Sequence, residues 1–308
     1  MPPIIGSRDP MAKILVLGGG GPLGRTLAER AREGRIRVEP AFPGPIEVVS
    51  LSRGQLNVSS YADVDRALQG HRPEVVVYAA GLTDVNVCEW NKWEAYLINR
   101  DGADQAARSC ARVGAAMVYF STDLLFDGVR RLPYREEDPP SPVNIFADTK
   151  LAGELAVMTH LPRHLILRTG WLYGAHYRGF VSAVMERLRA EDFVFGGRQS
   201  LRQPTWCEDL LEAMEALLSR SQTGTFHVAP QGEASEFDVA KKLVSLLRPT
   251  ATVEALEMSS ARSLLSPYSV LDCSKAKQAG VAIPKWEDSL ERYVRSLRGG
   301  DTKVTEPA

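Results

Sequence analysis

The fold of this chain is decided by KILVLGGGGPLG, residues 13–24, in which an apolar run passes directly into a glycine loop. Residues 13–18 are nearly all apolar, as in a strand that is buried on both faces of a parallel sheet. The stretch PLGRTLAERAREG, residues 22–34, has the periodicity of an amphipathic helix and ends at a glycine. A strand, a glycine-rich turn and a helix in this order are typical of the first unit of a dinucleotide-binding fold.

Four further apolar runs follow the first one, and they too are expected to be strands that are buried on both faces. They are IEVVSL at 46–51, EVVVYAA at 74–80, AMVYFS at 116–121 and HLILRTG at 164–170. Amphipathic stretches such as NRDGADQAARSCARVG, residues 99–114, lie between them. Strands that alternate with helices predict an α/β protein with a Rossmann-type, doubly wound parallel sheet.

The alternation becomes less regular after residue 170. Helical periodicity is present at 183–191, 208–220 and 236–247, and GTFHVA at 224–229 has the composition of a short strand. We expect a dinucleotide-binding domain over residues 11–170 and a smaller C-terminal lobe, mainly for substrate binding, over residues 171–298. Residues 203–230 also fit a return to the first sheet. The polar ends, residues 1–10 and 299–308, are predicted to be flexible tails.

Composition excludes several classes of function. Lys and Arg total 37 against 38 Asp and Glu, so the net charge of −1 gives no electrostatic reason to expect nucleic acid or an anionic membrane as partner. No apolar stretch approaches the roughly 20 residues that span a bilayer, and residues 1–10 lack the pattern of a secretory signal. The four cysteines and five histidines have no ligand-like spacing, which predicts reduced thiols, a cytoplasmic location and no metal centre.

The glycine loop has the spacing GxxGxxG at Gly18, Gly21 and Gly24. Glycines let the backbone turn tightly and approach a pyrophosphate, whose charge is favoured by the N-terminus of the following helix. We include the intervening Pro22 and Leu23 in this predicted cofactor-binding loop.

The ribose end of the cofactor site is read from the residues after the second strand. An acid about 20 residues beyond the glycine loop favours NAD(H), and Glu39 lies there, but a loop-like PAFPGP follows it. The stronger second strand, 46–51, is followed by Ser52 and Arg53. A hydroxyl and a guanidinium suit a 2′-phosphate, so NADP(H) is favoured and NAD(H) stays possible. The alternative for Arg53 is a solvated surface charge.

Segments along most of the chain carry a resemblance to a known family. They include YAAGLTDVNVCEWN at 78–91, STDLLFDG at 121–128, PYREEDPPSPVNIFADTKLAGE at 133–154, LRTGWLYG at 167–174 and QPTWCEDL at 203–210. With these segments the chain resembles the extended short-chain dehydrogenases, and most closely the dTDP-4-dehydrorhamnose reductase family. It is also similar to the regulatory β subunit of methionine adenosyltransferase.

The resemblance implies roles for particular residues. Asn57 and Val58 would lie beside the adenine, and Ala79, Ala80 and Gly81 would line the cofactor. The catalytic positions would be Thr122, which hydrogen-bonds the substrate carbonyl, and Lys150, which holds the nicotinamide ribose, with Phe146 between them in the chain. The implied substrate neighbours are Asp123, Leu124, Trp171, Tyr173, Arg202, Pro204 and Thr205.

Phe146 is the residue that departs most from the resembled family. The family's YxxxK motif reads Phe146-Ala-Asp-Thr-Lys150 here, so a phenyl ring occupies the position of the phenol that would protonate the nascent alkoxide. A positioned acid typically contributes about 10²–10⁴-fold to rate. Leu124 in place of an aromatic residue, and Gln199 and Arg202 in the segment before Pro204, are further departures near the implied substrate pocket.

These observations predict an NADP(H)-binding, nucleotide-sugar 4-keto reductase-like protein with an atypical active site, and they favour an oxidoreductase over a protein without catalytic activity. Two alternatives stay open: a catalytically silent cofactor-binding or regulatory subunit with a protein partner, and a redox-neutral enzyme on the same scaffold. By resemblance, a homodimer is also expected.

Overall fold

The computed structural model describes residues 11–256 and 264–299. The predicted tails at 1–10 and 299–308 lie outside the described residues, except for Gly299, which is the last residue of helix α11 (Trp286–Gly299).

The main sheet has six strands in the order β2-β1-β3-β4-β5-β9, and every pair of neighbours is parallel. Its strands are β1 (Ala12–Leu17), β2 (Ile46–Leu51), β3 (Val75–Tyr78), β4 (Ala116–Thr122), β5 (His164–Thr169) and β9 (Gly224–His227). Leu17 at the end of β1 is opposite both Leu51 and Tyr78, so β1, β2 and β3 end at one edge of the sheet. The predicted doubly wound parallel sheet is confirmed, with β1 and β3 at the point where the strand order reverses.

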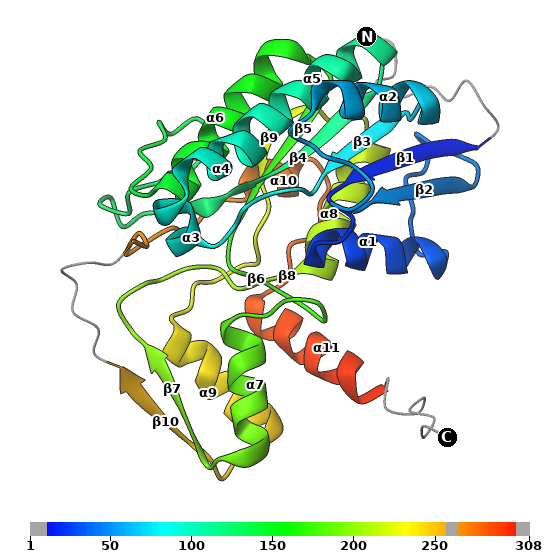
Figure 1. Ribbon diagram of the computed structural model, residues 1–308. Coiled ribbons are helices and arrows are strands. Elements are labelled where there is room, and N and C mark those ends of the chain that lie inside the picture. The colour runs from blue at the N-terminus through cyan, green and yellow to red at the C-terminus, as the bar shows by residue number, and fades with distance from the viewer. Residues whose placement is uncertain (1–10, 257–263, 300–308) are drawn as a thin grey trace.

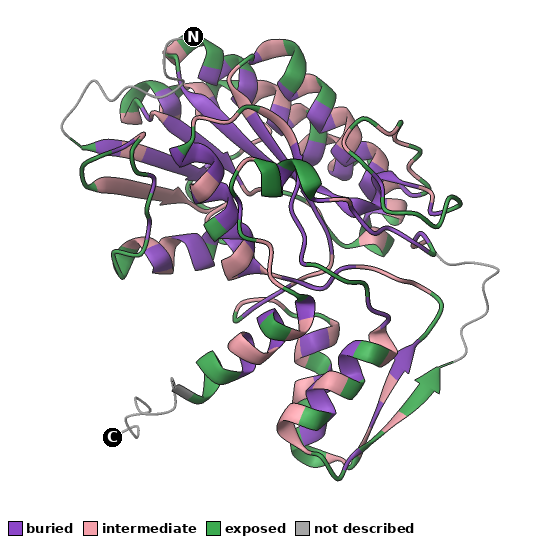
Figure 2. Cartoon of the chain, turned by 180° about the vertical axis from the view of Figure 1, so that it is seen from behind, coloured by how far each residue is buried: buried purple, intermediate pink, exposed green. Residues whose placement is uncertain are grey.

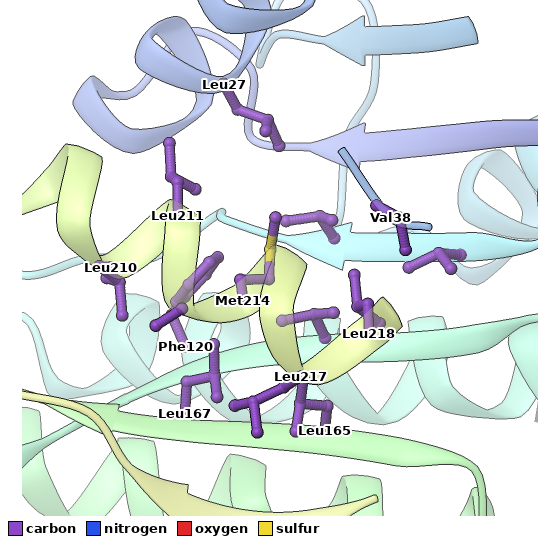
Figure 3. Packing of buried hydrophobic residues seen from close by; sticks show 14 of the residues in the cluster. Leu27, Val38, Phe120, Leu165, Leu167, Leu210, Leu211, Met214, Leu217 and Leu218 are labelled. Atoms are coloured by element: carbon purple, nitrogen blue, oxygen red, sulfur yellow. The ribbon is translucent and has the colours of Figure 1, made fainter. Parts of the chain in front are cut away.

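Helices cover both faces of this sheet (Figure 1). One face is covered by α1 (Pro22–Arg32) and α8 (Cys207–Ser219), and the other by α2 (Tyr61–His71), α5 (Gly102–Val113) and α6 (Ile145–His160). Figure 3 shows Leu211, Met214 and Leu217 of α8 packed between Leu27 of α1 and Leu165 of β5. Figure 2 shows that the central strands are mostly buried as a result.

The strand β2 differs from the sequence-based expectation. All six of its residues are partly exposed, because β2 is an edge strand that has, among the described residues, only β1 beside it. The expectation that each apolar run is buried on both faces is therefore wrong for residues 46–51, although their strand assignment is confirmed.

A smaller lobe lies below the sheet in Figure 1. It contains α7 (Phe180–Ala190), α9 (Glu236–Leu247), α11 and the parallel pair of β7 (Phe193–Gly197) and β10 (Thr252–Leu256), packed around a separate apolar cluster. Helix α8 packs instead on the main sheet, and strand β9 is part of that sheet, where it pairs with β5.

The remaining elements are short. They are α3 (Val85–Trp90), α4 (Lys92–Tyr96), the π-helical turn η1 (Leu97–Asp101), the 3₁₀ turn η2 (Asp123–Leu125), the paired strands β6 (Leu172–Tyr173) and β8 (Thr205–Trp206), and α10 (Ser274–Gln278).

Candidate active site

A pocket of about 670 Å³ opens at the edge where β1, β2 and β3 end. Four stretches of chain line it: the glycine loop, the residues after β2, the residues after β3, and the segment around α4. The lining residues are Gly18, Gly20, Gly21, Ser52, Arg53, Gly54, Leu56, Asn57, Val58, Ser59, Ala79, Ala80, Gly81, Leu82, Asn91, Trp93, Glu94, Leu97 and Ile98. The crevice at the reversal point of a parallel sheet is the usual ligand site of this architecture.

Two glycines allow the loop after β1 to pass close to its neighbours. Gly18 has φ of +98°, and a Cβ there would lie 2.3 Å from the backbone nitrogen of Ala80. A Cβ on Gly24 would lie 2.6 Å from the carbonyl oxygen of Gly18. Helix α1 can therefore begin directly under the loop, with Gly21 at its N-cap, and its N-terminus favours negative charge at the pocket.

Three residues of the predicted cofactor-binding loop are not among those that line the pocket. Leu23 is buried in the cluster that α1 forms with the sheet, Gly24 is buried against the loop, and Pro22 occupies the first turn of α1. Gly24 thus shapes the loop through its missing side chain, and Leu23 contributes to the core.

The residues after β2 line the pocket, but their polar groups are partly used within the protein. The backbone nitrogen and Oγ of Ser52 both donate to Oε1 of Gln55, at 2.9 Å and 2.8 Å. Arg53 is 89% exposed and its Nη2 lies 3.3 Å from Oε1 of Glu94 on α4. The wall that contains Asn91, Trp93 and Glu94 was not predicted from the sequence.

The π-helical turn η1 connects the wall of the pocket at Leu82 to helix α6 through hydrogen bonds. Asn99, at its centre, is fully buried; its Nδ2 donates to the carbonyl of Leu82 and to Oγ1 of Thr149, and its Oδ1 accepts from the nitrogen of Leu82. π-helical turns often lie at functional sites.

Phe146 and Lys150 lie one turn apart on α6, which begins at the N-cap Asn144. The ring of Phe146 is buried in an apolar cluster that includes Leu124. A phenyl ring has no hydrogen-bonding group to offer the site. The Nζ of Lys150 lies 3.9 Å from the ring centroid of Tyr119. Burial lowers the pKa of Lys150 to about 7, although the nearby Glu154 carboxylate acts in the opposite direction.

Asp123 and Arg202, both assigned to the substrate from the sequence, are bound to each other. Arg202 donates to the Asp123 carboxylate from Nε at 3.1 Å and from Nη2 at 3.0 Å, and Ser269 Oγ donates to the same carboxylate at 2.5 Å. Asp123 is 1% exposed. Thr122 Oγ1 lies 3.3 Å from Asp123 Oδ1 and accepts from the nitrogen of Leu124.

The other residues assigned to the substrate are mostly internal. Pro204 and Thr205 are buried, and Thr205 Oγ1 donates to the carbonyl of Gln203 at 3.0 Å. Trp171 and Tyr173 line a small pocket of about 50 Å³ beside α7, separate from the large one. Burial raises the pKa of the Tyr173 hydroxyl well above its ordinary value.

In residues 11–256 and 264–299, no group of three or more His, Cys, Asp or Glu side chains is arranged to hold a metal ion. No helix in that part of the chain is long and apolar enough to cross a bilayer.

Comparison with known proteins agrees with this geometry. The model of the family described as RmlD substrate binding domain matches residues 12–298. A dTDP-4-dehydrorhamnose reductase of Streptomyces griseus is 34% identical over 301 residues, which cover 94% of this chain and 95% of the relative. The spore coat polysaccharide biosynthesis protein SpsK of Bacillus subtilis is 30% identical, with 92% and 98% covered.

A solved structure gives the same result. The dTDP-4-dehydrorhamnose reductase of Bacillus anthracis, in complex with NADP, superposes with a TM-score of 0.84 at 28% identity, and the match covers 92% of this chain and 99% of that one. The UDP-glucose 4-epimerase of Thermus thermophilus, at 21% identity and a TM-score of 0.76, shares the fold. The chain belongs to the dTDP-4-dehydrorhamnose reductase family.

Proposed function

We propose that this chain binds NADP(H) and reduces the 4-keto group of a nucleotide sugar of the dTDP-4-dehydrorhamnose type. The observation that carries the proposal is the 670 Å³ pocket over the glycine loop, which has Arg53 at the end of β2. The main sheet would hold the dinucleotide, and the segment with Arg202 would border the sugar. The four cysteines of the chain are all buried and form no disulfide, which favours the reducing cytoplasm as its location.

The pocket residues suit each part of such a cofactor. The backbone at Gly18 and Gly21, with the N-terminus of α1, would hold the pyrophosphate. Asn57 and Val58 would contact the adenine, while Ala79, Ala80 and Gly81 leave space along the end of β3. When bound, the reduced nicotinamide supplies a hydride.

The chemistry left to the protein is the stabilisation of negative charge on the carbonyl oxygen. The hydroxyl of Thr122, at the end of β4, donates to Asp123 in this structure and would turn to hydrogen-bond that oxygen. The ammonium of Lys150 would hold the ribose and supply positive charge. Phe146 cannot donate a proton, so the proton would come from another group or from water. We therefore expect a slower reaction than a tyrosine at this position would give.

Phe146 also favours a second candidate, a catalytically silent protein that binds the cofactor as a regulatory subunit. A redox-neutral enzyme with a retained cofactor is the related possibility. In both cases the pocket would bind the dinucleotide, but added ketosugar would not oxidise it.

Single-turnover oxidation of NADPH with dTDP-4-keto-6-deoxy-L-mannose separates these functions. The proposal predicts measurable oxidation by the wild type and a faster rate for Phe146→Tyr, with Phe146→Leu as the matched control that adds no hydroxyl. A silent wild type with an active Phe146→Tyr variant would favour the regulatory or redox-neutral role. A wild type as fast as Phe146→Tyr would mean that another group already delivers the proton.

A further inference from the structure

The carboxylate of Glu94 is held in place at the mouth of the large pocket. Glu94 lies on α4, and its side chain is 26% exposed. Asn91 Nδ2 donates to Oε2 of Glu94 at 2.7 Å, and the backbone nitrogen of Glu94 donates back to Asn91 Oδ1 at 3.2 Å. With Oε2 bound in this way, the other oxygen, Oε1, is the one that contacts Nη2 of Arg53 at 3.3 Å.

Glu94 changes the charge of the corner of the pocket that is formed by Ser52, Arg53 and Glu94. Among the described lining residues, Arg53 and Glu94 are the two that carry a charge, so their pair is neutral. Ser52 cannot replace the arginine as an anion-binding group, because its backbone nitrogen and its hydroxyl both donate to Gln55. The affinity of the corner for an anion therefore depends on the competition between Arg53 and Glu94.

The two forms of the cofactor respond to such a corner in opposite ways. A 2′-phosphate is attracted by a guanidinium and repelled by a carboxylate. A ribose 2′-hydroxyl is recognised by a carboxylate that accepts its hydrogen bond, the part usually taken by an acid at the end of the second strand. Here β2 ends in Leu51, Ser52 and Arg53, and the carboxylate comes from α4 on the opposite wall.

From this geometry we infer that Glu94 is a specificity-determining residue, which restrains the preference of the pocket for NADP(H) and keeps NAD(H) acceptable. Arg53 acts in the opposite sense, toward the phosphorylated form. The inference rests on the proposed function, because it requires the dinucleotide to occupy this pocket.

The test is a pair of titrations on the full chain, with NADPH and NADH as probes. Trp93 lines the same pocket and is 74% exposed, so quenching of tryptophan fluorescence reports binding. The variant Glu94→Gln keeps the size of the side chain and removes its charge. We expect the ratio of the NADH to the NADPH dissociation constant to rise about tenfold, as for the loss of one like charge near a phosphate. The variant Arg53→Gln should lower the same ratio.

Asp101→Asn is the matched control. Asp101 is a carboxylate seven residues further along the chain that pairs with Arg100 and does not line the pocket, so the ratio should stay unchanged. Thermal unfolding of each variant confirms that it is folded.

Two results would overturn the inference. If the wild type binds both dinucleotides and Glu94→Gln leaves their ratio unchanged, or weakens both equally, Glu94 has no part in selecting the cofactor and the proposed function still holds. If the wild type binds neither dinucleotide, the proposed cofactor is wrong and the inference is lost with it.

Discussion

Arg202 donates two hydrogen bonds to the carboxylate of Asp123, from Nε at 3.1 Å and from Nη2 at 3.0 Å. These bonds connect the segment before β8 to the residue that follows β4. The side chains of Arg202 and Asp123 are 14% and 2% exposed, so the carboxylate is buried and the guanidinium is mostly buried, beside the candidate catalytic Thr122. Removal of one partner from a buried ion pair leaves an uncompensated charge. The pair therefore makes the relative position of these two segments sensitive to single substitutions.

We predict that Arg202→Met lowers the free energy of unfolding by about 3 kcal/mol, the usual cost of a broken buried pair. The added change Asp123→Asn should recover part of this loss, because it removes the unpaired charge and keeps an acceptor for Ser269. Urea denaturation of both variants at neutral pH provides the measurement. Arg108→Met, at an exposed pair with Asp104, is the control and should cost at most about 1 kcal/mol. If Arg202→Met and Arg108→Met lower the free energy of unfolding by the same amount, the pair of Arg202 with Asp123 contributes no more than an exposed pair, which would contradict the prediction.

Gly24→Ala should abolish or strongly weaken dinucleotide binding. The added Cβ would lie 2.6 Å from the carbonyl oxygen of Gly18 and 2.7 Å from Cα of Gly19, both backbone atoms, so the loop or α1 has to move. Gly54→Ala is the matched control, since Gly54 also lines the pocket and a Cβ there meets nothing within 4 Å. Titration with NADPH distinguishes the two variants, and comparable affinity in both would contradict the packing argument.

Lys150 should make the stability of the chain depend on pH. Burial lowers its pKa from 10.5 to about 7, so between these values the unfolded chain binds more protons at this residue than the folded chain. Stability therefore rises with pH over that range, and the cost of burying the ammonium is present in full below about pH 7. We predict that Lys150→Met is more stable than the wild type at pH 6 (about one unit below that pKa) and that this difference shrinks as the pH is raised.

Urea denaturation across that range, without cofactor, tests the prediction. Lys92→Met, at an exposed lysine, serves as the reference. A difference between wild type and Lys150→Met that stays constant from pH 7 to 10 would show that Lys150 is not buried as a charge.

The sheet could be predicted from the sequence because its strands are continuous apolar runs, which is a local property. The edge position of β2 could not, since residues 46–51 are no less apolar than the buried run 164–169, and their partial exposure comes from the lack of a second neighbouring strand among the described residues. The strand β9 fitted two locations, because membership of a sheet depends on pairing with β5 rather than on the composition of residues 224–229.

The candidate site was predicted in part for the same reason. Most of the glycine loop and the ends of β2 and β3 could be placed at the pocket, because parallel strands end at a common edge. Glu94 could not be placed there, since it comes 41 residues after Arg53 and no periodicity connects them. The pairing of Asp123 with Arg202 could not be predicted for the same reason, since the two residues are 79 positions apart. The sequence predicted for each of them a contact with substrate and no contact with the other.

Transfer of a labelled hydride tests the central claim most directly. The wild type would be incubated in single turnover with dTDP-4-keto-6-deoxy-L-mannose and NADPH deuterated at C4 of the nicotinamide, on either face in separate reactions. The account predicts a reduced sugar that carries deuterium at its C4 from one of the two cofactors. Recovery of the unreduced ketosugar without deuterium, from a protein that has bound NADPH, would contradict it.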